Sequence, residues 1–229
     1  MDIRKLVATV LGIDSNCLFG IASLAGLVEP RYAGFRYGIA LARPLDPGIL
    51  TQVRTGPTRA YLDHYRTVNR ELETIAAKVA DRLVAAGYRA LPLHPTADEQ
   101  TVNTQYRDTL SAPFSHKMAA TRAGLGWIGK TDLLVTPEYG PRVRLTTVLL
   151  DGEGITAGVP IEASRCGSCR MCADACPGQV ANGMAWDTSI HRDSYYDAHS
   201  CRETCRAITR KNLGEEISIC GICVAVCPV

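Results

Sequence analysis

The feature that most constrains this chain is a run of cysteines that begins at Cys166, ends at Cys176-Pro177 and has the spacing C-x2-C-x2-C-x3-C-P. Three thiolates spaced in this way lie on one tight loop, so they can face three corners of a 4Fe–4S cluster. The fourth thiolate is followed by a proline, which redirects the backbone, and it binds a neighbouring cluster. The run therefore predicts two clusters rather than one.

A second run, with the spacing C-x2-C-x3-C-P, ends at Cys227-Pro228. When the two runs are aligned on their C-P ends, Ile217 stands where a first cysteine would be. Cys201 and Cys205 lie just upstream, and either could supply the missing thiolate. The cluster ligands that the runs predict are Cys166, Cys169, Cys172, Cys176, Cys220, Cys223 and Cys227, together with Cys201 or Cys205.

Two other uses of cysteine fit this pattern less well. Disulfide frameworks are typical of small secreted domains, whereas this chain has 229 residues and no convincing export signal. Structural zinc sites are closed sets of four ligands, usually built from two C-x2-C pairs. The triplet of cysteines and the two C-P ends favour crossed cluster ligation instead.

The remaining composition indicates a cytoplasmic protein with an ordinary core. The net charge is +2, so no strong basic field indicates binding to nucleic acid. No apolar stretch reaches the length that spans a membrane. Thiolates that bind iron, in a chain without a clear targeting segment, are typical of the reducing cytosol.

Up to about residue 160, predicted helices alternate with predicted strands, which indicates an α/β sheet domain. Residues 3–28 read as one helix or two short ones, and Phe35–Arg43 as a strand. The clearest helix follows Thr58 and ends at Gly87, with apolar residues at helical spacing. From Ser164 onward the sequence is rich in cysteine and loops. We therefore predict two domains, 1–160 and 161–229.

A glycine-rich turn lies within the first predicted domain, in the sequence Ala123-Gly-Leu-Gly-Trp-Ile-Gly-Lys130. Its spacing fits neither the dinucleotide-binding motif nor the P-loop. Together with His116-Lys117, Ala119-Ala120 and both cysteine runs, it resembles the epoxyqueuosine reductase family. The resemblance covers roughly residues 60–229 and is strongest from residue 115 onward, and corrinoid reductive dehalogenases look similar.

The resemblance implies a nitroreductase-like sheet domain adapted to hold cobalamin, followed by a ferredoxin-like module with two 4Fe–4S clusters. It implies that Cys166, Cys169 and Cys172 share a cluster with Cys227. Cys201 matches the family's lone cysteine between the motifs, so it would complete the other cluster with Cys176, Cys220 and Cys223. It implies catalytic roles for His116 and Lys117, and cofactor binding at the turn by Gly124, Gly126, Trp127, Gly129 and Lys130.

The chain also departs from the family pattern. Members that reduce the modified tRNA base carry an aspartate before a small-Pro turn, where this chain has Leu110 before Ser111-Ala112-Pro113. The glutamate that follows the turn is replaced by His116. The chain also stops two residues after Cys227, without the family's C-terminal extension. We therefore expect a small-molecule substrate rather than tRNA, and an external ferredoxin-like or flavodoxin-like electron donor.

Two functions follow from these features. The first is an oxidoreductase in which two clusters pass electrons to a cofactor, with cobalamin as the candidate, or to a substrate in the N-terminal domain. The second is a ferredoxin-like carrier or electron-donating subunit without a catalytic site of its own. Bound corrinoid would favour the first function, and clusters alone would favour the second.

Overall fold

The computed structural model describes residues 2–12, 16–96 and 104–229. These residues form two compact units that alternate along the chain. Unit 1 consists of residues 1–44, 68–125 and 144–161, and unit 2 consists of residues 45–67, 126–143 and 162–229. The last of these boundaries lies at residues 161 and 162, next to the domain boundary expected from the sequence. The earlier segments of unit 2 lie within the predicted N-terminal domain.

Unit 1 is built on a four-stranded sheet with the strand order β1-β2-β6-β3. The pairs β1–β2 and β3–β6 are antiparallel. The strand interiors are apolar, and Ile39, Leu41, Leu149 and Leu150 are fully buried. The strands are β1 (Leu18–Ser23), β2 (Tyr37–Pro44), β3 (Arg89–Pro92) and β6 (Val143–Asp151).

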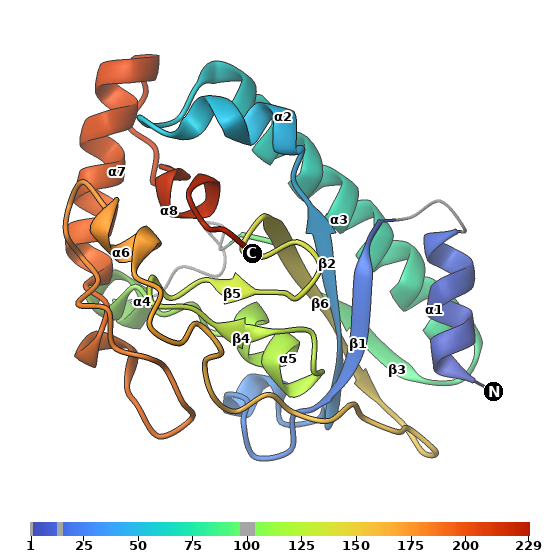
Figure 1. Ribbon diagram of the computed structural model, residues 1–229. Coiled ribbons are helices and arrows are strands. Elements are labelled where there is room, and N and C mark those ends of the chain that lie inside the picture. Colours follow the sequence, from blue (N-terminus) through green and yellow to red (C-terminus); the bar gives the residue numbers. More distant parts are fainter. Residues whose placement is uncertain (1, 13–15, 97–103) are drawn as a thin grey trace. The chain divides into compact units, whose positions relative to one another are not determined.

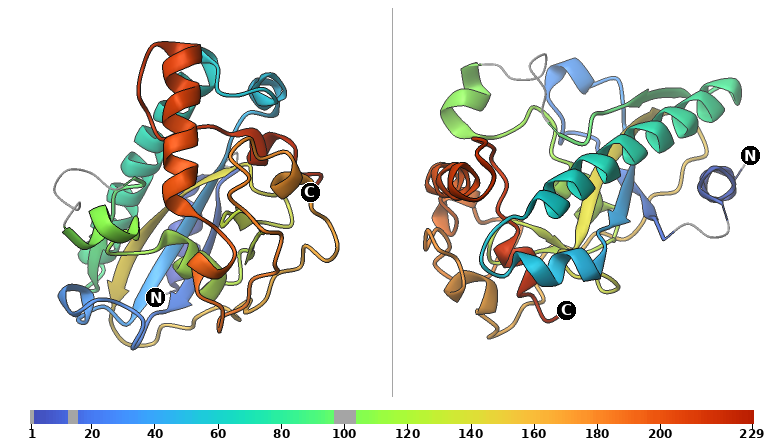
Figure 2. Two further views of the ribbon diagram at one scale, coloured as in Figure 1. Left: turned by 90° about the vertical axis from the view of Figure 1, so that its left-hand side faces the viewer. Right: turned by 90° about the horizontal axis from the view of Figure 1, so that it is seen from above.

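Helices cover both faces of this sheet (Figures 1 and 2). The long helix α3 (Arg59–Ala85) crosses one face, and α5 (His116–Arg122) packs against β1 and β2 on the other. Ser115 caps α5, because its side chain accepts a hydrogen bond from the backbone N–H of Met118. Two further helices are α1 (Ile3–Leu11) and α4 (Thr104–Thr109), and a short 3-10 helix spans Pro30–Tyr32.

Unit 2 contains short elements joined by loops. Its elements are α2 (Pro47–Leu50), a 3-10 helix (Thr51–Val53), the hairpin strands β4 (Trp127–Ile128) and β5 (Leu134–Val135), α6 (Met171–Asp174), a 3-10 helix (Arg192–Ser194), α7 (Ala198–Leu213) and α8 (Ile222–Ala225). The first turns of α3 also belong to this unit. Only α7 exceeds three turns among the helices that lie wholly in unit 2 and within the described part of the chain.

The α/β fold expected from the sequence is confirmed, but one element is different. The helix expected over residues 3–28 forms only as α1, and residues 18–23 form the strand β1. This segment pairs along its whole length with β2, from Leu18–Ala42 to Ser23–Tyr37. Partners in a sheet decide the structure of such a short apolar run, and they are not visible in the run itself. Residues 13–15 of this expected helical segment lie outside the described residues.

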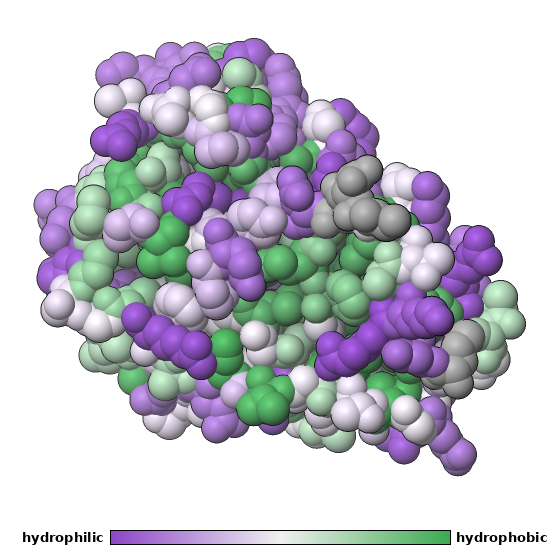
Figure 3. Space-filling model, turned by 45° about the vertical axis from the view of Figure 1, so that its right-hand side comes forward, coloured by the Kyte–Doolittle hydropathy of each residue, from purple (hydrophilic) through white to green (hydrophobic). Residues whose placement is uncertain are grey.

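Apolar side chains are not confined to the interior. On the face that Figure 3 shows, hydrophobic residues (green) lie among hydrophilic ones (purple). Val159, which is 83% exposed, is among the large hydrophobic side chains at the surface. Across the described residues, no helix combines the length and the hydropathy needed to cross a membrane.

Helix α3 depends on its buried face, and this dependence can be tested. Leu72 is fully buried in α3, whereas Val84 on the same helix is 56% exposed. We expect Leu72→Ala to lower the free energy of unfolding by about 2–5 kcal/mol, because removal of a buried leucine side chain leaves a cavity. Anaerobic urea unfolding of the cluster-loaded protein measures this change. Val84→Ala is the control, and an equal loss for both variants would contradict the assigned face.

Candidate iron–sulfur site

The first cysteine run lies on a loop that leads into α6, and Cys227 approaches it from the end of the chain. Burial raises the pKa of Cys172, and the nearby thiols of Cys227 and Cys166 raise it further. Burial also raises the pKa of Cys227, with further contributions from Cys166 and Cys169. Arg142 donates a hydrogen bond to the carbonyl oxygen of Cys227 (3.0 Å) and fixes this end of the chain. Cys166, Cys169, Cys172 and Cys227 are therefore near one another, and their ligation of one shared cluster stays a prediction.

A second set of thiols forms where α7 lies beside the second run. The Cys201 and Cys205 sulfurs are 3.9 Å apart, as expected for residues four apart on one helix face. Cys205 and Cys220 shift one another's pKa, and Cys220 and Cys201 both raise the pKa of Cys223, so these thiols lie near one another. Burial raises the pKa of Cys223 to about 12. The hydrogen bond from Cys205 is the main cause that lowers the pKa of Cys201 to about 6.

Cys176 is the remaining cysteine of the first run, and it follows α6. Its backbone N–H donates to the carbonyl oxygen of Ala173 (3.2 Å), and its own carbonyl accepts from Gln179 (3.0 Å). These bonds fix the loop that Pro177 redirects. Its ligation of the second cluster stays a prediction.

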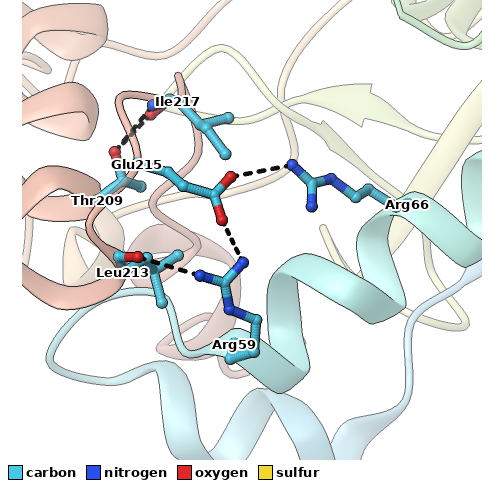
Figure 4. Close-up of polar contacts among 6 residues, drawn as sticks. All are labelled: Arg59, Arg66, Thr209, Leu213, Glu215 and Ile217. Carbon is cyan, nitrogen blue, oxygen red and sulfur yellow. Dashed lines mark hydrogen bonds and ion pairs between the residues drawn. The ribbon is translucent and has the colours of Figure 1, made fainter.

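Helix α7 is held against the second run at the position where that run lacks a cysteine. The Thr209 hydroxyl donates to the carbonyl oxygen of Ile217 (2.9 Å) and accepts from its backbone N–H (3.0 Å), as Figure 4 shows. Thr209 is fully buried, and it continues the face that carries Cys201 and Cys205. Helix α7 therefore brings the thiols of Cys201 and Cys205 to the part of the second run where Ile217 replaces a cysteine.

The start of α3 braces the far end of α7. Arg59 pairs with the Glu215 carboxylate and donates to the carbonyl oxygen of Leu213 (3.1 Å). Arg66 binds the other Glu215 oxygen (3.2 Å), so two guanidinium groups flank one carboxylate (Figure 4). These side chains are 35–50% exposed, and such surface pairs contribute little individually. Their contribution is to fix the loop between α7 and the second cysteine run.

The β4–β5 hairpin, which holds most of the glycine-rich turn, packs on the first cysteine loop. The indole N–H of Trp127 donates to the Cys166 sulfur (3.3 Å), and Trp127 is 6% exposed. The Lys130 ammonium donates to the carbonyl oxygen of Gly167 (2.9 Å) and is 4% exposed. From the sequence, Trp127 and Lys130 are predicted to bind a cofactor in the N-terminal domain. In the structure they bind the loop that carries the cluster ligands.

The glycines of the turn have partners within the protein. A Cβ at Gly124, where φ is +79°, would lie 2.6 Å from the Val159 carbonyl oxygen. A Cβ at Gly126 would lie 2.2 Å from the Val135 carbonyl oxygen, and one at Gly129 would lie 2.9 Å from the Val135 side chain. Protein atoms therefore occupy the space beside each glycine, which does not fit a cradle for a large ring. The cofactor-binding role of these glycines stays a prediction.

His116 and Lys117 begin α5 in unit 1. His116 Nε2 lies 2.8 Å from the carbonyl oxygen of His94, and Nδ1 lies 3.0 Å from the Thr147 hydroxyl. A carbonyl only accepts, so Nε2 carries the proton and Nδ1 accepts from Thr147. Burial lowers the pKa of His116 to about 4, and Arg144 lowers it further. The ring is therefore neutral at pH 7 and is held by both nitrogens.

Leu110 ends α4 in an unusual backbone conformation. Its φ is +53°, and its N–H donates to the carbonyl oxygen of Tyr106 (2.7 Å). Asp108, the nearest carboxylate in sequence, has an exposed side chain on α4. The described structure thus places a leucine, with no proton to give, where the family pattern has an acid.

Sequence reasoning missed residues that hold the cysteine segments in place from other parts of the chain. Arg142 donates to the carbonyl oxygen of Cys227 (3.0 Å), and the Tyr195 hydroxyl donates to Asp132 of the β4–β5 hairpin (3.0 Å). Neither residue belongs to a spacing motif, and each contact joins segments that are distant in the chain.

Comparison with known proteins agrees with this site. Residues 165–229 match the model of the 4Fe-4S double cluster binding domain. The epoxyqueuosine reductase of Synechococcus sp. (strain CC9605) is 29% identical over 183 residues, which are 80% of this chain and 50% of that protein. That of Atelocyanobacterium thalassa is 33% identical over 134 residues, which are 55% of this chain and 40% of that protein.

Solved structures share the fold. The catabolic reductive dehalogenase NpRdhA superposes with a TM-score of 0.68 at 20% identity, covering 99% of this chain and 31% of its own. The epoxyqueuosine reductase from Bacillus subtilis gives a TM-score of 0.61 at 19% identity, covering 98% of this chain and 64% of its own.

The chain is therefore an iron–sulfur protein of the double-cluster class, and the prediction of two 4Fe–4S clusters is confirmed. Its resemblance to the epoxyqueuosine reductase family is confirmed as well. The chain spans about half or less of the length of these two curated relatives.

The choice between Cys201 and Cys205 as cluster ligand can be tested by iron content. We expect Cys201→Ser to lose about half of the iron, because one of two clusters loses a ligand. Cys205→Ser should keep full iron, because Cys205 is then a buried thiol beside the ligand rather than the ligand itself. Iron and sulfide analysis after anaerobic reconstitution measures both variants. The opposite pattern would exchange the roles of these two cysteines.

Proposed function

We propose that this protein is an iron–sulfur oxidoreductase that takes electrons from an external ferredoxin-like or flavodoxin-like donor. The two clusters pass these electrons to a small-molecule substrate or to a cofactor in the sheet unit. The observation that carries the proposal is the indole N–H of Trp127, which points at the Cys166 sulfur (3.3 Å). Hydrogen bonds to cluster sulfurs tune the reduction potential, which a cluster with a purely structural role would not need.

Cobalamin is the cofactor that we propose, supported by a relative described in terms of B12-dependent dehalogenation. When bound, it would supply a cobalt centre able to reduce a carbon substrate. The packed glycines of the turn do not support a site there. The proposal therefore places no reaction step at this turn.

Within this proposal, His116 and Lys117 act at the start of α5. His116 is neutral at pH 7 and donates through Nε2, so it orients its neighbours rather than supplying a proton as a strong acid. Lys117 is half-buried beside it and is the hydrogen-bond donor that we assign to the substrate or the cofactor.

We further propose that epoxyqueuosine in tRNA is not the substrate, although one relative was solved with an epoxyqueuosine-modified tRNA stem loop. Removal of an epoxide oxygen needs a proton at that oxygen, and a positioned acid contributes about 10²- to 10⁴-fold in rate. Leu110 cannot supply that proton. The net charge of +2 gives no strong attraction for a phosphate backbone either.

The cofactor proposal is tested by titrating the cluster-loaded protein with cobalamin under anaerobic conditions. We expect a change in the cobalamin absorption spectrum and a calorimetric heat, with saturation at one equivalent. If neither a spectral change nor a heat is observed, cobalamin is not the electron acceptor, and the alternative of an electron-carrying subunit is favoured. Heat-denatured protein is the control for non-specific binding.

The substrate proposal is tested at Leu110 with epoxyqueuosine-containing tRNA and a strong one-electron donor. We expect no turnover by the unchanged protein and measurable queuosine formation by Leu110→Asp. Aspartate tolerates the positive φ of +53° better than leucine does, so the change should not strain the loop. Leu110→Asn matches the aspartate in size without an acidic proton and should stay inactive. Turnover by the unchanged protein that Leu110→Asp does not improve would refute the proposal.

A further inference from the structure

The two predicted clusters have different surroundings within unit 2. We call the cluster predicted on Cys166, Cys169, Cys172 and Cys227 the first cluster, and the cluster predicted on Cys176, Cys201, Cys220 and Cys223 the second cluster. A cluster becomes more negative by one charge when it takes up an electron. Nearby cations, hydrogen-bond donors and water therefore raise its reduction potential. The side chains around each set of ligands thus indicate which cluster is reduced first.

Three cations lie against the segments that carry the ligands of the first cluster. The buried Lys130 ammonium donates to the carbonyl oxygen of Gly167 in the first cysteine loop (2.9 Å). The Arg142 guanidinium donates to the carbonyl oxygen of Cys227 (3.0 Å), so its charge lies beside a predicted ligand. Arg165 directly precedes the first cysteine of the loop. These charges favour the more negative, reduced state of the first cluster.

Trp127 adds a fixed hydrogen-bond donor at the Cys166 sulfur. Its indole N–H donates to that sulfur (3.3 Å), and the ring is held in β4, where Trp127 pairs with Val135 of β5. The guanidinium carbon of Arg165 lies 5.8 Å from the centroid of the Trp127 ring, which keeps this cation beside the same ligand. A Cβ at Gly129 would lie 3.8 Å from the Cys166 sulfur, so the hairpin backbone also packs on it. The donor is therefore positioned before any electron arrives.

The first cluster is also the one with an exposed ligand. Cys169 is exposed, whereas each of the four predicted ligands of the second cluster is only partly exposed. Water stabilises the added negative charge, so exposure acts in the same direction as the cations. Arg170 beside Cys169 pairs with Asp174 (3.3 Å), and this pair adds no net charge to the loop.

The side chains near Cys201 differ from those around the first cluster. The Cys201 sulfur lies 3.9 Å from the Cys205 sulfur, and a thiol is a weaker donor than an indole N–H. Asp197 lies one helical turn before Cys201 and accepts its backbone N–H (3.0 Å), which brings a carboxylate to this part of α7. Arg202 beside Cys201 pairs with Glu203 (3.5 Å). These neighbours favour the reduced state of the second cluster less.

We propose that Trp127 and the neighbouring cations give the first cluster the higher reduction potential, so that it holds the electron in the half-reduced protein. One electron leaves the reduced second cluster, which is oxidised, and the first cluster is reduced. The indole proton stays on Trp127, and no bond forms or breaks. This inference rests on the proposed electron-transfer function, but it concerns the clusters themselves and not the donor protein, the substrate or cobalamin.

The order of reduction is tested by a redox titration of the full, anaerobically reconstituted chain, followed by electron paramagnetic resonance. The serine variant of Cys201 or Cys205 that loses half of the iron retains the first cluster, and its spectrum is the reference signal. We expect the first half of the titration to produce this signal. The preference should be at least about tenfold in the one-electron equilibrium constant, or about 59 mV. Appearance of the other signal first, or of both signals together, would overturn the proposal.

The role of the donor is tested by Trp127→Phe, which keeps an aromatic ring and has no N–H. We expect it to lower the potential of the first cluster by about tenfold in the same equilibrium constant, or about 59 mV, and to leave the second cluster unchanged. Trp186→Phe is the matched control. The carbonyl oxygen of Trp186 accepts from the backbone N–H of Ser164 (2.7 Å), a bond that phenylalanine keeps, so both potentials should stay unchanged.

Lys130→Gln is the second variant, because glutamine keeps an N–H donor for Gly167 and removes the charge. It should also lower the potential of the first cluster alone, and it replaces Trp127→Phe if that variant loses iron. Unchanged potentials, or equal shifts of both clusters, in an iron-replete variant would overturn the proposal. Loss of iron from both variants would assign these residues a structural role and overturn it too. Clusters that a strong one-electron reductant cannot reduce would refute the proposed function as well.

Discussion

The folding of unit 2 depends on one constraint: cysteine sulfurs from distant segments of the chain must come together to bind iron. The thiols of Cys223 and Cys172 are partly buried, and this burial is the main cause that raises the pKa of each. Iron offsets this cost, because metal binding replaces the protons and couples to folding. The short helices and loops of the unit fit this view, since a segment with little apolar core needs such cross-links.

The hairpin β4–β5 contacts the first cysteine loop directly and is part of the predicted cluster site. Trp127 donates to the Cys166 sulfur, and Lys130 donates to the carbonyl oxygen of Gly167 in the first cysteine loop. Glycine at 126 and 129 lets the hairpin fold tightly enough to bring these donors into place, since any Cβ would collide with Val135. The glycine-rich turn thus supports the first cysteine loop, and its predicted cofactor-binding role stays a prediction.

The sheet unit carries different chemistry. His116 is tied by both ring nitrogens and is neutral at pH 7, which suits an orienting role more than acid catalysis. Leu110 holds a left-handed φ at the end of α4, a conformation that leucine rarely adopts. Leu110 and His116, two of the departures from the family pattern, therefore lie in unit 1, whereas residues 165–229 match the double cluster binding domain.

The sequence by itself determined the clusters, the α/β class and the best-marked helices. Cysteine spacing carries the ligand geometry locally, and the helix that follows Thr58 carries its own apolar face. Tertiary structure alone decided that residues 18–23 form a strand, because their partner is β2. It also decided that Trp127 donates to the Cys166 sulfur and that Arg142 donates to the carbonyl oxygen of Cys227. These contacts join residues that are 39 and 85 positions apart, and no local spacing pattern indicates such partners.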